Sequence, residues 1–369
     1  MTSHDRRPPP KPSRRSEVSP FLALEVLRAA GDHEAEGRHI VHMEVGQPGS
    51  PAPRAVLAAA HRALEDGRLG YTESLGLRPL RSRIARHYGE AYGIEVPADR
   101  VVVTTGSSAG FNLAFLAAFD AGDRIGIAAP GYPAYRNIMG ALGIEAVDIP
   151  TDASTRHAVT PEMLAEVHAR APLAGLLIAS PGNPTGTMLR PEALAALVAA
   201  ARDLHIRFIS DEIYHGLVYD GVAETALRTD PGAIVINSFS KYYCMTGWRI
   251  GWMVLPEDLV RPVERIAQSL YISPPDLSQR AAIAAFDATE ELEAVKAGYA
   301  ANRRLLLERL PAIGFDDFAP DACLINHYAP GALMGLHQDR DERDLAQPIV
   351  SVSLGVPADF LWGGLRRAE

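Results

Sequence analysis

The chain has 369 residues, 47% of them hydrophobic and 22% charged, so it can bury a large core and form two domains of ordinary size. Its formal net charge of -9 gives no general attraction to nucleic acid or to an anionic membrane surface. The apolar stretches are too short to span a bilayer, and the two distant cysteines, Cys244 and Cys323, predict no disulfide framework, so we expect a cytoplasmic protein.

Residues 1–17 are basic and proline-rich without an apolar segment, which predicts a disordered tail rather than a signal peptide. A short strand is predicted over 41–46, and a polar loop that ends in glycine over 71–76. Helical spacing of apolar residues predicts three helices in this part of the chain, over 21–30, 55–65 and 77–92.

From residue 100 onward, apolar strands alternate with glycine or proline turns and with helices. Strands are predicted over 101–105, 125–129, 176–179 and 206–209, and two more apolar runs, 234–236 and 250–254, flank Lys241. Helices are predicted over 111–119, 191–204 and 277–310. This alternation predicts an α/β fold with a mainly parallel sheet sandwiched by helices.

Lys241 lies between the two last strands, where a buried lysine is costly unless the protein uses it. The simple alternative is a surface lysine on a connecting loop. Against it, the surrounding loop is crowded with donors and contains no acidic residue to receive them: Ser238, Ser240, Tyr242, Tyr243 and Arg249. Such a cluster suits a phosphate-bearing ligand that the lysine holds covalently.

Other polar residues follow the predicted strands, where ligands bind in open α/β sheets. Gly106, Ser107 and Ser108 open a helix, whose backbone N–H groups form a natural phosphate cradle. Asn183 lies between two prolines and could be a turn residue only. Asp211 follows a buried strand and could equally be a helix N-cap.

Taken together, these residues resemble the class I/II aminotransferases, which are fold-type I pyridoxal-phosphate enzymes. The resemblance covers residues 18–318. The matching segments occur in the expected order: YTESLG (71–76), TTGSSAGF (104–111), APGYPAY (129–135), SPGNPTG (180–186), SDEIYHGLVY (210–219) and SFSKYYCMTGWRIGW (238–252).

The resemblance implies a role for each matching residue. Lys241 would form the internal aldimine with pyridoxal 5'-phosphate and then act as the base that moves the α-proton. Asp211 would keep the pyridine nitrogen protonated. Asn183 and Tyr214 would hydrogen-bond the ring oxygen, and Tyr132 would stack on the ring. The phosphate would be held by Gly106, Ser107, Ser108, Ser238 and Arg249.

The same resemblance implies contacts beyond the cofactor. Tyr71 matches a residue that reaches into the site of a neighbouring subunit, so we expect a homodimer. Gly46 and Asn183 match positions near the substrate carboxylate. The substrates would be an amino acid and a 2-oxo acid, and neither a membrane nor nucleic acid is an expected partner.

After about residue 320 the family pattern stops, and the arginine that would clamp the substrate carboxylate has no match. Arg366 and Arg367 are not assigned that role. Residues 319–369 instead resemble part of the AlkB-type iron(II)/2-oxoglutarate dioxygenases. Asn326 and Tyr328 match 2-oxoglutarate contacts, Asp341 a base contact, and His337 and Asp339 two ligands of an iron triad whose third ligand is absent. We therefore expect no metal site there and favour an exposed polar loop.

These observations predict five segments: a tail (1–17), an N-terminal arm with part of a small domain (18–48), a large cofactor-binding domain (49–270), the start of a C-terminal small domain (271–318) and a foreign segment (319–369). The predicted function is an aminotransferase that acts through Lys241, with turnover impaired by the missing arginine. The alternatives are another fold-type I enzyme such as a lyase or decarboxylase, a dioxygenase remnant, and a non-catalytic cofactor-binding regulator.

Overall fold

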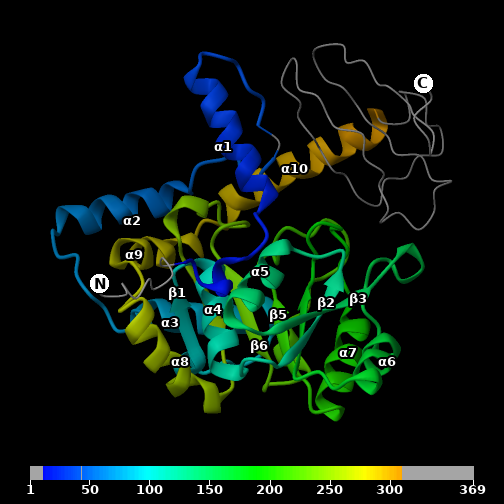
Figure 1. Ribbon diagram of the computed structural model, residues 1–369. Coiled ribbons are helices and arrows are strands. Elements are labelled where there is room, and N and C mark those ends of the chain that lie inside the picture. Colours follow the sequence, from blue (N-terminus) through cyan, green and yellow to red (C-terminus); the bar gives the residue numbers. More distant parts are fainter. Residues whose placement is uncertain (1–10, 43, 310–369) are drawn as a thin grey trace, which may run out of the picture.

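The computed structural model describes residues 11–42 and 44–309. Within these ranges a seven-stranded sheet forms the centre of the molecule, in the order β1-β7-β6-β5-β4-β2-β3 (Figure 1). Its strands are β1 (Val101–Thr104), β2 (Arg124–Ala129), β3 (Glu145–Pro150), β4 (Gly175–Ala179), β5 (Arg207–Asp211), β6 (Ile234–Ser238) and β7 (Gly251–Val254). Among these described strands β7 alone is antiparallel to its neighbours, so the predicted α/β fold with a mainly parallel sheet is confirmed.

Helices cover both faces of this sheet. They are α1 (Leu22–Ala35), α2 (Arg54–Glu65), α3 (Arg78–Tyr92), α4 (Gly106–Ala118), α5 (Pro133–Leu142), α6 (Pro161–Arg170), α7 (Pro191–Asp203), α8 (Glu257–Leu270), α9 (Asp276–Ala285) and α10 (Thr289–Arg309). Helix α1 and the distal part of α10 project from the body of the molecule (Figure 1), and Ala30 is the one buried residue of α1 among those described. No helix in the described ranges combines the length and apolarity that crossing a bilayer requires.

Alternate strand residues point to opposite faces and build two hydrophobic clusters. Val101 and Val103 of β1 belong to a cluster shared with α2, α3, α7 and α9, whereas Val102 belongs to one shared with α4, α5 and α8. The same alternation separates Val235 from Ile236 in β6. Because both faces are buried, these strands read as continuous apolar runs, and that is why the sequence revealed them.

Two predicted elements are wrong. The described residues of 41–46 form no strand, because no neighbouring strand pairs with them. The helix predicted over 277–310 is two helices, α9 and α10, interrupted where Phe286 turns into the core beside Phe239, with ring centroids 5.4 Å apart. Four elements carried no recognised signal in the sequence, namely α5, β3, α6 and α8.

Candidate functional site

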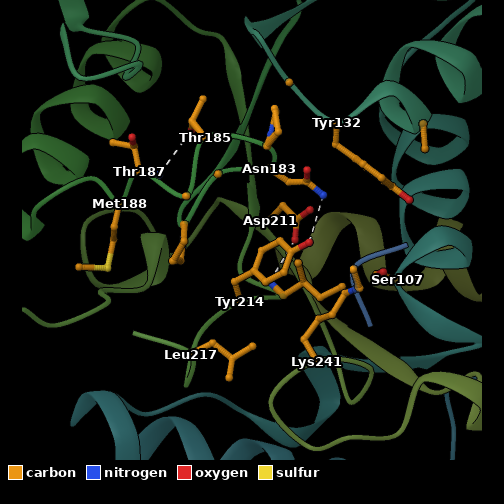
Figure 2. Close-up of a pocket in the computed structure, with 18 of the residues that line it drawn as sticks. Ser107, Tyr132, Asn183, Thr185, Thr187, Met188, Asp211, Tyr214, Leu217 and Lys241 are labelled. Atoms are coloured by element: carbon orange, nitrogen blue, oxygen red, sulfur yellow. Dashed lines mark hydrogen bonds between the residues drawn. The ribbon is translucent and has the colours of Figure 1, made fainter. Parts of the chain in front are cut away.

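A cavity opens where the parallel strands end (Figure 2). Five polar side chains that line it lie at or just after the ends of five different strands, β1, β2, β4, β5 and β6: Ser107, Tyr132, Asn183, Asp211 and Lys241. Ser108, Tyr214 and Gly46 also line this cavity. The structure therefore brings together eight of the residues that the sequence singled out, at the sheet edge where ligands are expected.

Lys241 extends into the cavity from the segment after β6. Its Nζ donates a hydrogen bond to the carbonyl of Gly46 at 2.7 Å and lies 5.8 Å from the centre of the Tyr214 ring. Burial lowers the pKa of Lys241, Asp211 raises it, and Arg249 lowers it again. A lowered pKa increases the fraction of neutral amine, which is the form that can attack a carbonyl.

Asp211 ends β5 with 3% of its surface exposed. Its Oδ1 accepts the Ile213 N–H at 3.0 Å, and its Oδ2 accepts the hydroxyl of Tyr135. Burial raises the pKa of Asp211 to about 6, although both hydrogen bonds and Lys241 favour the charged form. No described cation forms an ion pair with this carboxylate, so a positively charged group bound in the cavity would stabilise it.

Tyr135 was not predicted as a site residue, although the quoted segment APGYPAY ends with it. It lies on α5, is 4% exposed, and contacts Asp211 only because the sheet places α5 beside the end of β5. Tyr132, which precedes α5, is half-buried and packs edge-to-face on Tyr135 and Phe21, with ring centroids 5.2 and 5.6 Å away.

Asn183 and Tyr214 meet across the cavity. The Asn183 side-chain amide donates to the Tyr214 hydroxyl oxygen at 3.1 Å. Burial, followed by the charge of Asp211, raises the pKa of Tyr214 to about 12. Tyr214 therefore keeps its proton at neutral pH, and this hydroxyl can donate to an oxygen of a ligand while Asn183 supplies a second donor.

The first turn of α4 lies at the cavity, beside Arg249. This turn contains no acidic residue, and its N-cap Thr105 makes no side-chain hydrogen bond to it. The guanidinium of Arg249 lies against Gly106: a Cβ placed on Gly106 would be 2.5 Å from Arg249 Nη2. A helix N-terminus and an arginine that has no acidic partner among the described residues form a site that an anion would stabilise, and Ser107 and Ser108 line the cavity there. The residues present fit a phosphate group.

Several predicted residues are outside the cavity lining. Ser238 is 1% exposed, and its hydroxyl hydrogen-bonds Ser240 and the Ile250 carbonyl. Tyr71 is 84% exposed. Gly106 and Arg249 lie behind the lining, next to Ser107. The residues matched to the dioxygenase pattern, Asn326, Tyr328, His337, Asp339 and Asp341, lie outside the described residues.

The sequence profile of the family "Aminotransferase class I and II" matches residues 38–329. The chain belongs to this aminotransferase family. Its members use pyridoxal phosphate, which agrees with the cofactor predicted for this protein. The match continues past residue 318, where the predicted resemblance ends, and nothing in the comparisons supports a dioxygenase-like segment.

Named relatives agree with this membership. The aminotransferase is 50% identical over 310 residues to a valine–pyruvate aminotransferase of Mycobacterium tuberculosis, covering 83% of this chain and 79% of that protein. A crystal structure of an aminotransferase from Mycobacterium tuberculosis has a TM-score of 0.81 at 48% identity, covering 85% of this chain and 81% of that one. Aspartate aminotransferase of Thermus thermophilus with maleate has a TM-score of 0.78 at 30% identity, covering 83% and 81%.

Proposed function

We propose that this aminotransferase moves the amino group of a small branched aliphatic amino acid, such as valine, to a 2-oxo acid such as pyruvate. The placement of Lys241 in a cavity with Asp211, Asn183 and Tyr214 carries the reaction type. The substrate class is supported by the 50% identity to a valine–pyruvate aminotransferase.

The composition of the cavity wall supports an aliphatic substrate. Apolar side chains from three segments line it: Ile138, Met188, Leu217 and Val218. Three arginines also line it, Arg156, Arg190 and Arg303, and none of them forms an ion pair with another described residue. We propose that one of these arginines receives the substrate carboxylate. We also propose that turnover of this aminotransferase is impaired, on the single ground that the carboxylate-binding arginine of the family has no match after residue 320.

The cofactor would be held along its whole length by residues of this chain. Ser107, Ser108, Ser238, Arg249 and the backbone at Gly106 would hold the phosphate, with Arg249 as the charged donor. The ring would lie beside Tyr132. When bound, pyridoxal phosphate supplies a conjugated ring that withdraws electrons from the substrate α-carbon.

Asp211 would hold a proton on the ring nitrogen. A charge pair about 4 Å apart at an effective dielectric of about 20 is worth roughly 4 kcal/mol. Raising a pKa by two units requires about 2.7 kcal/mol, so the carboxylate is sufficient. Lys241 Nζ, with its lowered pKa, would act as the nucleophile and then take the α-proton of the substrate.

The domain division and the subunit arrangement are part of this proposal. We propose a large domain over 49–270, smaller-domain parts over 18–48 and 271–318, and a homodimer in which the exposed Tyr71 reaches the partner's site. Residues 1–17 are proposed as a tail and 319–369 as a separate C-terminal segment. No dioxygenase activity is proposed, because none of the similarities found supports a dioxygenase-like segment.

The direct test is to reconstitute the purified protein with pyridoxal phosphate, to add L-valine and pyruvate, and to quantify alanine by chromatography. We expect alanine with the wild type and at least about 10³-fold less with Lys241→Ala. If no donor and acceptor pair tried yielded the amino acid that corresponds to the acceptor 2-oxo acid, the reaction type would be refuted. A kcat/KM for L-aspartate above that for L-valine would refute only the substrate class.

A further inference from the structure

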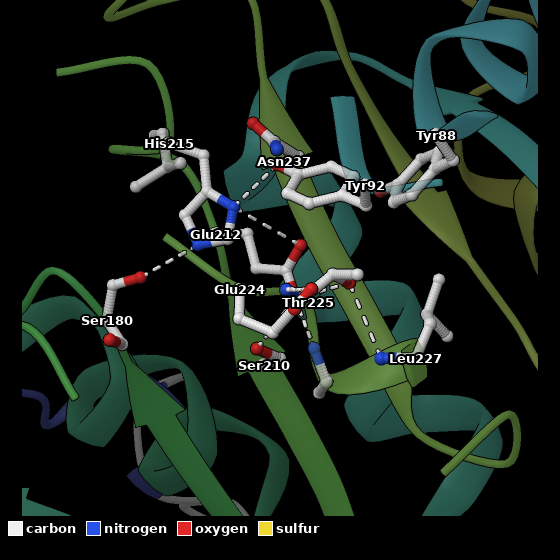
Figure 3. Close-up of polar contacts among 12 residues, drawn as sticks. Tyr88, Tyr92, Ser180, Ser210, Glu212, His215, Glu224, Thr225, Leu227 and Asn237 are labelled. Atoms are coloured by element: carbon white, nitrogen blue, oxygen red, sulfur yellow. Dashed lines mark hydrogen bonds and ion pairs between the residues drawn. The ribbon is translucent and has the colours of Figure 1, made fainter. Parts of the chain in front are cut away.

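The segment that follows β5 has two polar sides. Asp211 and Tyr214 line the cavity, whereas the neighbouring Glu212 and His215 are buried on the opposite side, with 1% and 9% of their surface exposed. Figure 3 shows Glu212 and His215 among polar residues from α3, the loop after β4 and the segment before β6. The role proposed for the cavity does not use these buried groups.

His215 connects two elements that are distant in the sequence. Its Nε2 lies 2.9 Å from the carbonyl of Ser180, which can only accept, so Nε2 carries a hydrogen. Its Nδ1 lies 2.7 Å from the hydroxyl of Tyr92, the last residue of α3. Burial lowers the pKa of His215 to about 4, so the ring is neutral and Nδ1 accepts the Tyr92 hydrogen.

Glu212 fixes the same segment from the other direction. Its Oε1 accepts three hydrogen bonds of 3.0 Å, from the hydroxyls of Ser210 and Thr225 and from the Ala226 N–H. Within the described residues its Oε2 has no hydrogen-bond partner and lies 3.7 Å from His215 Nδ1. Burial raises the pKa of Glu212 to about 8, so at neutral pH the hydrogen bonds among Glu212, Ser210, Thr225 and Ala226 join neutral groups.

The buried contact of His215 parallels a contact in the cavity. Ser180 precedes Asn183 by three residues, and His215 directly follows Tyr214. The loop after β4 and the segment after β5 are therefore joined twice, by Ser180–His215 in the core and by Asn183–Tyr214 in the cavity. Because both contacts join the same two segments, losing the first contact removes one of the two restraints on the separation of Asn183 and Tyr214.

We propose that His215, held by its hydrogen bonds to Tyr92 and Ser180, is a positioning residue that sets the separation of Asn183 and Tyr214 for the cofactor ring. This inference rests on the proposed function, because it assumes that the cavity binds pyridoxal phosphate. The competing explanation is that these buried groups only stabilise the fold.

Two tyrosines of α3 separate the explanations. Tyr92→Phe removes the hydrogen that His215 Nδ1 accepts. Tyr88→Phe removes a hydroxyl one turn earlier on the same helix, where it accepts the Trp252 Nε1 hydrogen at 3.1 Å. Tyr88 is fully buried and does not line the cavity, so it is a matched control for stability.

The measurements are the melting temperature of the apoprotein, the Kd for pyridoxal phosphate, and the pH midpoint of the visible absorbance of the bound cofactor. We expect both variants to melt earlier. Only Tyr92→Phe should bind the cofactor about tenfold more weakly and shift the pH midpoint, since misplacing one hydrogen-bonded pair costs about that factor. His215→Gln, which keeps a donor near the Nε2 position, should remain closer to the wild type than His215→Leu.

Equal Kd values and equal pH midpoints for Tyr92→Phe and Tyr88→Phe would overturn the positioning role and leave the proposed function intact. A wild-type protein that binds no pyridoxal phosphate would instead refute the proposed function. If His215→Leu does not fold, the comparison of the two tyrosine variants still decides the outcome.

Discussion

Replacing Gly106 with alanine tests whether Arg249 and the first turn of α4 form the phosphate site. Gly106 has a φ of +73°, a conformation that L side chains rarely adopt. The added Cβ would lie 2.5 Å from Arg249 Nη2 and 3.1 Å from its Cζ, so the guanidinium has to move. We expect weaker cofactor binding as well as lower stability.

The two effects have separate magnitudes. The backbone strain of an alanine in this region is worth about 1–2 kcal/mol, which lowers the melting temperature of a protein of this size by about 1–3 °C. A displaced Arg249 loses a charge-assisted hydrogen bond of about 1.5–3 kcal/mol, so the Kd for pyridoxal phosphate should rise roughly 10- to 100-fold.

Gly67 provides the matched control. Its φ is +65°, and a Cβ placed there would meet nothing within 4 Å. Gly67→Ala should therefore lower the melting temperature like Gly106→Ala but leave the Kd unchanged. The assay is a fluorescence titration of each apoprotein with pyridoxal phosphate beside a thermal melt. If the two variants lost cofactor affinity equally, or if neither did, Arg249 would not hold the phosphate.

The remaining predictions concern the buried carboxyls. Tyr135→Phe removes a hydrogen bond that favours the charged form of Asp211, so the pKa of Asp211 should rise above about 6. The Kd of the Tyr135→Phe variant for pyridoxal phosphate should then be several-fold higher than that of the wild type at pH 7 and nearly equal to it at pH 8.5. The same loss of affinity at both pH values would contradict this prediction. Because the folded pKa of Glu212 is raised from 4.5 to about 8, the contribution of this carboxyl to the stability of the apoprotein should be largest below pH 4.5 and should fall by about 1.4 kcal/mol per pH unit as the pH rises toward 8. Glu212→Gln should reduce the dependence of the melting temperature on pH across that range. An unchanged dependence would show that Glu212 does not titrate there.

Burial on two faces explains which strands the sequence revealed. Strands β1, β6 and β7 are buried at every residue, so their apolar runs were visible without knowledge of the sheet. Strand β3 lies at the sheet edge and is mostly not buried, and its residues Glu145 and Asp148 interrupt any apolar run. An edge strand with little burial leaves too weak a pattern to predict.

The cavity was predictable because its residues follow strands. Lys241, Asp211 and Asn183 each occur where an apolar run ends, and parallel strands bring such ends to one edge. Tyr135 was missed because it lies on a helix, and no periodicity in the sequence indicates which helical residue will face Asp211. The resemblance supplied the roles of Ser238 and Tyr71, which the described cavity lining does not include.

The polar residues after β5 show why a strand end gives incomplete information. Asp211 and Glu212 are adjacent, and adjacent residues of an extended chain point to opposite sides. The Asp211 carboxyl therefore reaches the cavity, and the Glu212 carboxyl enters the core. There it accepts hydrogen bonds from the hydroxyls of Ser210 and Thr225 and from the Ala226 N–H. A cluster of polar residues at a strand end thus contains both residues that can contact a ligand and residues that hold the first group in position. The alternation of side chains along the strand can separate these two groups of residues in the sequence. Only the packed structure identifies the partners of the buried group, because Tyr92 lies 123 residues from His215.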